Sequence, residues 1–370
     1  MPPLALSLRR SFYCCKVTSF ASAAPSKKKN LVFLGSPRVS LPVLDALLDA
    51  SSLSTSIFRL AAIVTQPPSR RDRGRKMMQS PVAESALERG FPQDLIFTPE
   101  RAGEESFLSD LKALNPELCI TAAYGNILPS KFLDIPPYGT VNVHPSLLPL
   151  YRGAAPVQRA LQDGVKETGV SLAYTVRALD AGPVISQEKV EVDGNIKAPE
   201  LLLELFGKGA KLLIRELPSI LDGSAKYKAH AQDDSKASLA PKLKADESWI
   251  SFEQVATQIH NKVRAFAGWP GTRARLQVID GKCNANVLEI KIITTRVYRT
   301  SETNGGEDEI LFGGSSLLIP CAGSTLLEVL ELQLPGKRVT SAVDFWNGLR
   351  GRKLKKFDIS IRPVSQERYC

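Results

Sequence analysis

The sequence is poor in the residues that build disulfide frameworks and structural metal sites. Its 370 residues include six cysteines and three histidines. Cys14 and Cys15 lie close to the N-terminus, and the remaining four cysteines are scattered without a C-x-x-C pair. We therefore expect reduced thiols, with neither disulfides nor a bound metal.

Long apolar runs are absent as well. No segment approaches the roughly 18 consecutive apolar residues that span a bilayer, so we expect no membrane association. A hydrophobic content of 43% and a charged content of 23% are ordinary for a globular protein. The length allows two domains with separate cores, and we expect a monomer.

Acidic residues are missing from residues 1–29, which carry six of the ten net positive charges and many serines and alanines. A basic, serine-rich, acid-free N-terminus is typical of an organellar transit peptide. The early pair Arg9 and Arg10 favours the mitochondrial matrix over the chloroplast. A disordered basic tail is the alternative interpretation.

The remaining positive charge gathers in two clusters. The segment "RRDRGRK" spans residues 70–76, and residues 337–368 hold nine basic side chains against three acidic ones. Either cluster could be a solvated surface. Two of them on a mildly basic protein favour a polyanionic partner, with nucleic acid first.

Strand-like and helical segments alternate over about 190 residues. An apolar run at 31–34 ends on Gly35, and apolar residues at helical spacing follow it. Further strands are expected at 59–65, 117–125 and 140–144, and further helices at 81–90, 104–114, 154–164 and 198–217. This order predicts a doubly wound, mostly parallel, Rossmann-like sheet over residues 30–222. Its first turn, "GSPRVS", has one glycine where a dinucleotide fingerprint needs three, so NAD is not implied.

The composition turns polar at 223–244, which predicts a linker between domains. After it come one helix, expected at 253–267, and several short strand-like runs with turn signals. Short strands without βα alternation predict a small β-barrel over residues 245–370. An oligonucleotide-binding (OB-like) barrel is one candidate.

Polar side chains stand where two predicted strands end. In "VNVHPSLLP", Asn142 and His144 leave the same face of a strand that prolines then stop. Asp180, in "RALDAGPVI", follows a later strand. A histidine beside a carboxylate is a competent base, and an asparagine amide can stabilise an oxyanion. No G-x-S-x-G elbow accompanies them, which favours direct transfer between two bound substrates over an acyl-enzyme.

The same three residues also have plain structural interpretations. A histidine at a strand end is often only a hydrogen-bonded structural residue. Asn142 could tie down the following loop, and Asp180 could be a turn aspartate. Spacing alone leaves these alternatives open.

The segment "VNVHPSLLPLYRGAAPVQRAL", followed by "ETGVSLAYTVRALDAGPVI", closely resembles the folate-dependent formyltransferases. The segments "VTQPPSRRDRGRKMMQSPV", "AAYGNILP", "SLAPKL" and "RAFAGWPGT" are similar to the members of that superfamily that formylate the methionine on initiator tRNA. The resemblance runs from about Asn30 to about Phe357.

The resemblance implies 10-formyltetrahydrofolate as co-substrate, initiator methionyl-tRNA as partner, and three groups of site residues. The catalytic trio is Asn142, His144 and Asp180. The folate-binding turn is Ser146, Leu147, Leu148 and Pro149. The tRNA-binding residues are Arg70, Arg71, Arg73, Arg75 and Lys76, of which Arg73 or Arg75 probes the acceptor stem, together with the barrel residues Lys353, Lys355 and Lys356. The alternatives are formyl transfer to a small amine, hydrolysis of formylfolate and, least favoured, non-catalytic RNA binding.

Overall fold

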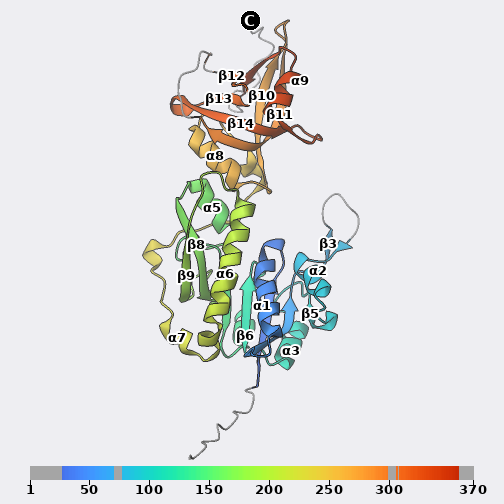
Figure 1. The fold of residues 1–370 in the computed structure, drawn as a ribbon, viewed down its shortest axis with the longest axis vertical. Coiled ribbons are helices and arrows are strands. Elements are labelled where there is room, and N and C mark those ends of the chain that lie inside the picture. The colour runs from blue at the N-terminus through green and yellow to red at the C-terminus, as the bar shows by residue number, and fades with distance from the viewer. Residues whose placement is uncertain (1–26, 71–76, 299–305, 307, 358–370) are drawn as a thin grey trace, which may run out of the picture.

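The computed structural model describes residues 27–70, 77–298, 306 and 308–357. An α/β domain and a β-barrel follow one another along the long axis of the molecule (Figure 1). The predicted transit segment lies almost wholly outside the described residues. Lys29, which we assigned to it, is the first residue of the first strand, and its ammonium group contacts Glu117 at 2.8 Å.

The first domain is built on one seven-stranded sheet with the order β5-β2-β1-β6-β7-β8-β9. These strands are β1 (Lys29–Gly35), β2 (Phe58–Val64), β5 (Ile96–Phe97), β6 (Leu118–Ala122), β7 (Thr140–His144), β8 (Glu167–Tyr174) and β9 (Val184–Glu191). Pairings among the first five are parallel, whereas β8 pairs antiparallel with both neighbours. The predicted doubly wound, mostly parallel sheet is confirmed.

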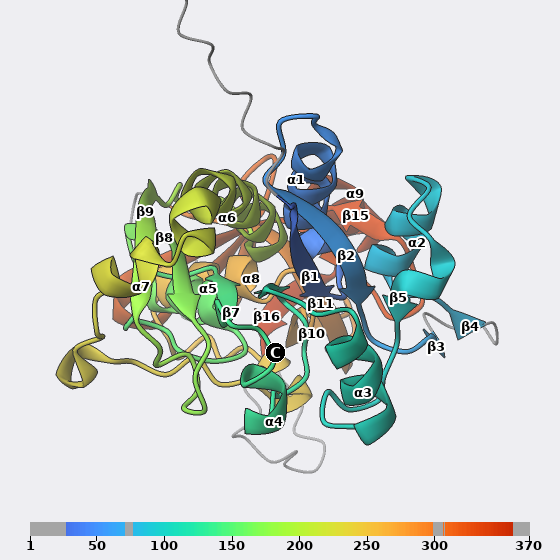
Figure 2. The same cartoon turned by 90° about the horizontal axis from the view of Figure 1, so that it is seen from below.

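Alternation along β1 explains why both faces of the sheet are covered. Leu31 and Phe33 pack into the core under α1 (Leu41–Ser52), α2 (Pro81–Glu88) and α6 (Ala198–Leu221). Val32 and Leu34 pack on the opposite side against α3 (Glu105–Ala113) and α4 (Ser130–Leu133). Figure 2 shows α1 and α6 on one side of the sheet and α3 and α4 on the other.

Local sequence sets the ends and the depth of the helices near β7. Pro156 begins α5 (Pro156–Asp163), and Gly164 ends it in the left-handed conformation at φ 74°. Gly209 brings α6 close to the sheet, since a β-carbon there would stand 2.5 Å from Val143 Cγ1. The strand that carries Asn142 and His144 is thus held tightly between a helix and its neighbouring strands.

The second domain is a closed antiparallel barrel. Its strands are β10 (Thr272–Ile279), β11 (Ala285–Val297), β12 (Glu309–Phe312), β13 (Leu317–Cys321), β14 (Thr325–Gln333), β15 (Val339–Ser341) and β16 (Lys353–Lys356). Six of them close in the order β11-β10-β16-β12-β13-β14, and β14 pairs back onto β11. The predicted barrel is confirmed, with one strand more than the five of a standard OB fold. Helices α8 (Ala256–Ala265) and α9 (Ala342–Gly348) pack on its core.

The segment predicted as a linker runs back along the first domain. It contains α7 (Ser224–Lys228) and forms β-bridges from His230 to Val184 and from Leu239 to Arg152. The remaining short elements are the hairpin of β3 (Ser69–Arg70) and β4 (Met77–Met78) and the 3-10 turns Arg38–Ser40, Gln93–Leu95, Asp234–Lys236, Ala245–Ser248 and Ala322–Ser324. Among the described helices, none has the length and apolarity to cross a membrane.

Candidate active site

The three residues singled out from the sequence converge at the carboxyl end of β7. Asn142 Nδ2 lies 3.4 Å from Asp180 Oδ1, and His144 Nδ1 lies 3.8 Å from Asp180 Oδ2. The His144 side chain is 5% exposed and that of Asp180 is 16% exposed. An imidazole, an amide and a carboxylate therefore share one largely dehydrated site, where electrostatic interactions are stronger than in water.

The hydrogen bond of His144 fixes which ring nitrogen is free. Its Nε2 lies 3.1 Å from the carbonyl oxygen of Tyr151. A carbonyl only accepts, so Nε2 carries the proton of the neutral ring and Nδ1 keeps a lone pair. Nδ1 is also the nitrogen that faces Asp180. A proton taken up there would lie next to a carboxylate.

The loop that carries Asp180 is held from two sides. Asp180 itself has φ 46°, a left-handed conformation that is uncommon for a residue other than glycine. Its Oδ2 accepts from the backbone N–H of Gly153 at 2.9 Å. Gln232 Nε2 donates to the carbonyl oxygens of Asp180 and Gly182 at 2.8 and 2.7 Å. The loop after β7 thus restrains the carboxylate, and the segment after α7 restrains the backbone.

Arg152 anchors Gln232 in turn. Its guanidinium donates twice to Gln232 Oε1, at 2.9 and 2.8 Å, and once to Asp234 Oδ1 at 2.8 Å. Arg152 is buried, so this charge must be paired to be tolerated. Gln232 and Asp234 belong to the stretch predicted as a linker, which therefore forms part of the scaffold of the site.

The predicted folate-binding turn is rigid and internally bonded. Ser146 Oγ donates to the Leu150 carbonyl oxygen at 2.6 Å, so its hydroxyl is already engaged. Ser171 Oγ donates to the Ser146 carbonyl at 2.6 Å and accepts from the Leu148 N–H at 3.0 Å. Leu148 is buried, Leu147 is half-buried, and Pro149 follows Leu148 through a cis peptide bond. The structure places this turn directly after His144.

Three exposed apolar side chains lie in the loops near the trio. Ile127, in the loop after β6, is 93% exposed, and Leu179, beside Asp180, is 66% exposed. Leu150, in the turn after β7, is 43% exposed. The loops that carry Ile127 and Leu150 leave the carboxyl ends of the parallel strands β6 and β7, the edge at which ligands of α/β sheets bind. Leu179 belongs to the loop after the antiparallel strand β8, which returns to this edge and places Asp180 beside Asn142 and Gly153. Bare apolar surface of this kind suits a flat heteroaromatic ring.

Those predicted tRNA-binding residues that the structure describes lie apart from the trio. Arg70 is exposed at the end of β3, in a hairpin that projects from the first domain (Figure 1). Arg71, Arg73, Arg75 and Lys76 lie outside the described residues. The three lysines belong to the barrel strand β16 and are not brought next to the trio.

The three lysines differ in their surroundings. Lys353 is exposed and lies 3.7 Å from Glu309. Lys356 has a side chain only 16% exposed, and it pairs with Asp308 at 3.5 Å and Glu253 at 3.7 Å. Lys355 is half-buried. Lys356 therefore forms ion pairs within the protein, which the sequence did not indicate.

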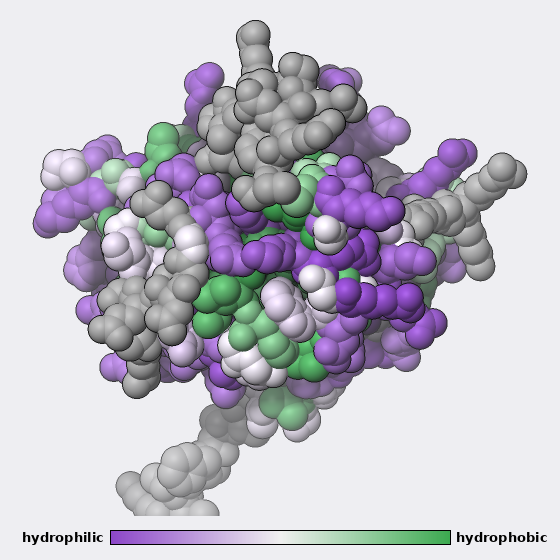
Figure 3. Space-filling view, turned by 90° about the horizontal axis from the view of Figure 1, so that it is seen from above, coloured by the Kyte–Doolittle hydropathy of each residue, from purple (hydrophilic) through white to green (hydrophobic). Residues whose placement is uncertain are grey.

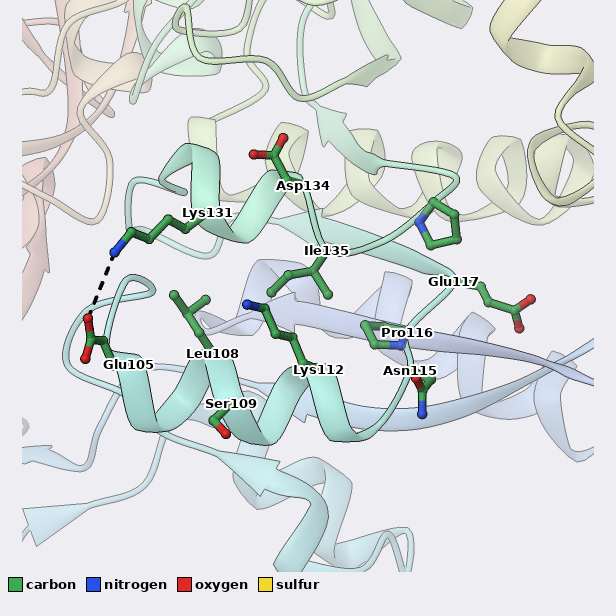
Figure 4. A pocket seen from close by; sticks show the side chains of 11 residues that line it. Glu105, Leu108, Ser109, Lys112, Asn115, Pro116, Glu117, Lys131, Asp134 and Ile135 are labelled. Carbon is green, nitrogen blue, oxygen red and sulfur yellow. Dashed lines mark ion pairs between the residues drawn. The ribbon is translucent and has the colours of Figure 1, made fainter.

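Two concave surfaces lie apart from the trio. A cavity of about 960 Å³ between α3 and α4 is lined by Asn115, Pro116 and Glu117, which precede β6, and Lys131 and Glu105 face each other across it at 4.0 Å (Figure 4). A groove of about 550 Å³ on the barrel has Phe345 among its apolar lining residues and Arg352 among its basic ones. Figure 3, which views the barrel end, shows apolar side chains gathered among hydrophilic ones.

Two buried cysteines among the described residues have thiols of low reactivity. Burial raises the pKa of the Cys119 thiol well above its usual range, and it raises the pKa of Cys321 to about 12. Both thiols stay neutral at physiological pH and so are poor nucleophiles. In the same part of the chain, no group of three or more His, Cys, Asp or Glu side chains is placed to hold a metal ion.

Comparison with known proteins agrees with this architecture. Residues 29–217 match the formyl transferase family, and residues 242–350 match the formyl transferase C-terminal domain. The methionyl-tRNA formyltransferase of Pelobacter propionicus is 36% identical over 321 residues, which cover 86% of this chain and 93% of that one. The enzyme of the same name from Bacillus licheniformis is 33% identical over 318 residues, covering 86% and 94%.

Solved structures of lower identity share the fold. A sugar 3N-formyl transferase superposes with a TM-score of 0.56 at 18% identity, over 84% of this chain and 99% of that one. An N-formyltransferase from Helicobacter canadensis gives 0.54 at 16% identity, over 82% and 99%. From the family matches and the full-length relatives, the chain belongs to the formyl transferase family and, within it, to the methionyl-tRNA formyltransferases.

Proposed function

We propose that this protein transfers the formyl group of 10-formyltetrahydrofolate to the α-amine of methionine carried by initiator tRNA. The observation that carries the proposal is the convergence of Asn142, His144 and Asp180 at one edge of the sheet. The chain is also similar over most of its length to methionyl-tRNA formyltransferases.

His144 acts as the base in this proposal. As the methionine amine bonds to the formyl carbon, Nδ1 takes up one proton from the amine, because Nε2 already donates to the Tyr151 carbonyl. The resulting imidazolium places its new N–H toward Asp180 Oδ2. Asp180 thereby stabilises the charged ring without accepting the proton permanently.

Asn142 stabilises the oxyanion. The formyl oxygen becomes negative when the amine adds, and the amide Nδ2 is the neutral donor of the trio. One hydrogen of Nδ2 points to Asp180 over a long 3.4 Å contact, and the second hydrogen is available to the oxygen. The bond between the formyl carbon and N10 then breaks, and N10 receives the proton that the amine lost.

The turn after His144 fits the role of a folate site. The hydrogen bonds of Ser146 and Leu148 give that turn one fixed shape. The exposed apolar side chains of Ile127, Leu150 and Leu179 offer surface to a planar ring. A preformed, mostly apolar surface with a few fixed polar groups is usual for such ligands.

We assign tRNA binding to residues 70–76 and to the barrel. Phosphate contacts from Arg70, its neighbours and Lys353 and Lys355 would dominate the affinity. Among the neighbours, Arg73 or Arg75 is the side chain that reads the end of the acceptor stem.

The test of the proposed function is product formation. Purified protein, 10-formyltetrahydrofolate and charged initiator tRNA should give formylmethionine bound to tRNA. Formylation of amino sugars or other free amines at higher kcat/KM would favour the second candidate, which the shared fold of the sugar formyl transferase supports. Release of formate without an acceptor would instead indicate a hydrolase.

We further propose that the protein acts as a monomer in the mitochondrial matrix. The basic, acid-free composition of residues 1–29 supports import. A fluorescent protein fused behind residues 1–29 should collect in mitochondria. Collection in chloroplasts, or a diffuse distribution, would contradict the assignment.

A further inference from the structure

The orientation of the Asn142 amide follows from its neighbours. A carboxylate oxygen only accepts hydrogen bonds, so the atom of Asn142 that lies 3.4 Å from Asp180 Oδ1 is the amide nitrogen. Its Oδ1 therefore points the other way. There it accepts from Thr121 Oγ1 at 2.8 Å.

Thr121 lies in β6, directly beside Asn142 in the register of the parallel β6–β7 pair. Thr121 is only 7% exposed, so water cannot readily replace its hydroxyl as the donor to Asn142. The Thr121 hydroxyl is thus the contact that fixes the rotation of the Asn142 amide about its last side-chain bond. It holds the Nδ2 hydrogens toward Asp180 and the reacting group.

We infer that Thr121 is a positioning residue for formyl transfer, which acts by orienting Asn142 as the oxyanion donor. This inference rests on the proposed function. A donor accelerates a reaction only when it already points at the oxygen on which charge develops. Loss of the Thr121 hydroxyl would let the amide rotate, and kcat would fall while substrate binding persists.

The chain supplies a matched control in Thr140. This residue opens β7, two positions before Asn142, and is 2% exposed. Within the described residues its Oγ1 has no hydrogen-bond partner. Thr140→Val makes the same chemical change as Thr121→Val, next to the same strand pair, without removing a bond to Asn142.

The experiment is a double-mutant cycle on the full-length protein, read as single-turnover and steady-state formylation of methionyl initiator tRNA. We expect Thr121→Val to lower kcat roughly 5- to 50-fold, with both KM values within about twofold of wild type. Thr121→Ser should recover most of kcat, and Thr140→Val should keep it. In an Asn142→Ala background, Thr121→Val should cause no further loss.

Three outcomes would overturn the assignment of Thr121. They are an unchanged kcat in Thr121→Val, an equal loss in Thr140→Val, and an equal loss with and without the Asn142 amide. Should Thr121→Val not fold, Thr121→Ala serves in the same cycle. A wild-type protein that yields no formylmethionine overturns the proposed function instead, so the two failures are distinguishable.

Discussion

Nε2 of His144 lies 3.1 Å from the carbonyl oxygen of Tyr151, while its other ring nitrogen faces Asp180. The backbone therefore selects the tautomer of His144, and the carboxylate is left to stabilise the protonated ring. In many catalytic sites a carboxylate selects the tautomer by accepting from the histidine. Here the two interactions have different partners, so in the proposed reaction Nδ1 is the atom that takes up and releases the proton.

This division of tasks predicts the effect of His144→Gln. A glutamine can place its amide nitrogen near the position of Nε2 and keep the bond to Tyr151, but it has no basic lone pair. We expect kcat to fall by about 10²–10⁴ with the tRNA Kd changed less than about threefold. Turnover and tRNA binding, measured on the same preparation, check this.

His230→Gln is the matched control, because His230 is tied to Val184 through its backbone only among the described residues. It should retain wild-type turnover. A His144→Gln variant that loses tRNA affinity as strongly as it loses turnover would show that His144 shapes the binding surface rather than moving a proton.

A change at Gln232 tests whether the segment of residues 223–244 holds the Asp180 loop in place. Gln232→Glu keeps the acceptor for Arg152 but replaces the donor to the Asp180 and Gly182 carbonyls with a second oxygen. The loop should shift and move the Asp180 carboxylate away from His144. Because small misplacements at a reacting centre are costly, we expect kcat to drop about 10- to 100-fold with little change in KM.

The control for this change is Gln258→Glu, which adds the same charge at an exposed position of α8. It should be silent in steady-state assays. Equal kcat values for Gln232→Glu and wild type would mean that Gly153 alone suffices to hold the carboxylate.

Sequence periodicity was sufficient to predict the α/β sheet and the strand that ends on His144. The spacing of apolar residues within one segment reflects the two-residue repeat of strands and the 3.6-residue repeat of helices, so it can be recognised without knowledge of distant contacts. The barrel was predictable as a class, but β16 was not. Its sequence, "KLKK", is basic and short, and only Leu354 points into the core.

The partners of the trio were not predictable. Thr121 precedes Asn142 by 21 residues, and Gln232 follows Asp180 by 52. Neither has a local pattern that marks it, because their contacts depend on strand order and on the return path of residues 223–244. The polar composition of that segment indicated a linker, but it did not indicate that Gln232 and Ser238 hydrogen bond to the loops that follow β8 and β7.

The surroundings of His260, at the junction of the two domains, predict how the stability of the protein depends on pH. Its Nε2 donates to the Gly194 carbonyl of the first domain, and its Nδ1 lies 2.9 Å from Thr295 Oγ1 in β11. Burial, with a smaller effect of nearby Arg264, holds the pKa of His260 below its ordinary 6.5. The unfolded chain therefore binds this proton more readily than the folded chain. The contribution of neutral His260 to the free energy of unfolding is therefore complete above pH 6.5, and it is lost as the pH falls below that value.

His260→Gln keeps a donor for Gly194 without a titrating group. We expect the drop in Tm between pH 7.5 and pH 5.5 to be smaller for this variant than for wild type. Calorimetry at the two pH values checks the difference, which isolates His260 from the other histidines. Parallel Tm losses in both proteins would assign the acid sensitivity to other groups.

Arg73 and Arg75 should control which tRNA is accepted. Replacing the arginine that probes the acceptor stem should narrow the ratio of kcat/KM between initiator and elongator methionyl-tRNA. Contacts to phosphates alone cannot discriminate in this way. Alanine variants of each arginine, assayed with both tRNAs, identify the reader. If neither variant changes the ratio, discrimination resides elsewhere.

Lys355 and Lys356 should respond differently to charge reversal. Lys355 has no ion pair within the described residues, so its charge is available to a phosphate. Lys355→Glu should therefore weaken the binding of initiator and elongator tRNA alike. It should also reduce the slope of log K against log salt by about one. Lys356→Glu instead places a carboxylate beside Asp308 and Glu253. Its main effect should be a lower Tm, because like charges then face each other at a side chain only 16% exposed. Filter binding across a salt series, with Tm measured in parallel, separates the two; equal salt slopes for Lys355→Glu and wild type would remove Lys355 from the RNA-binding surface.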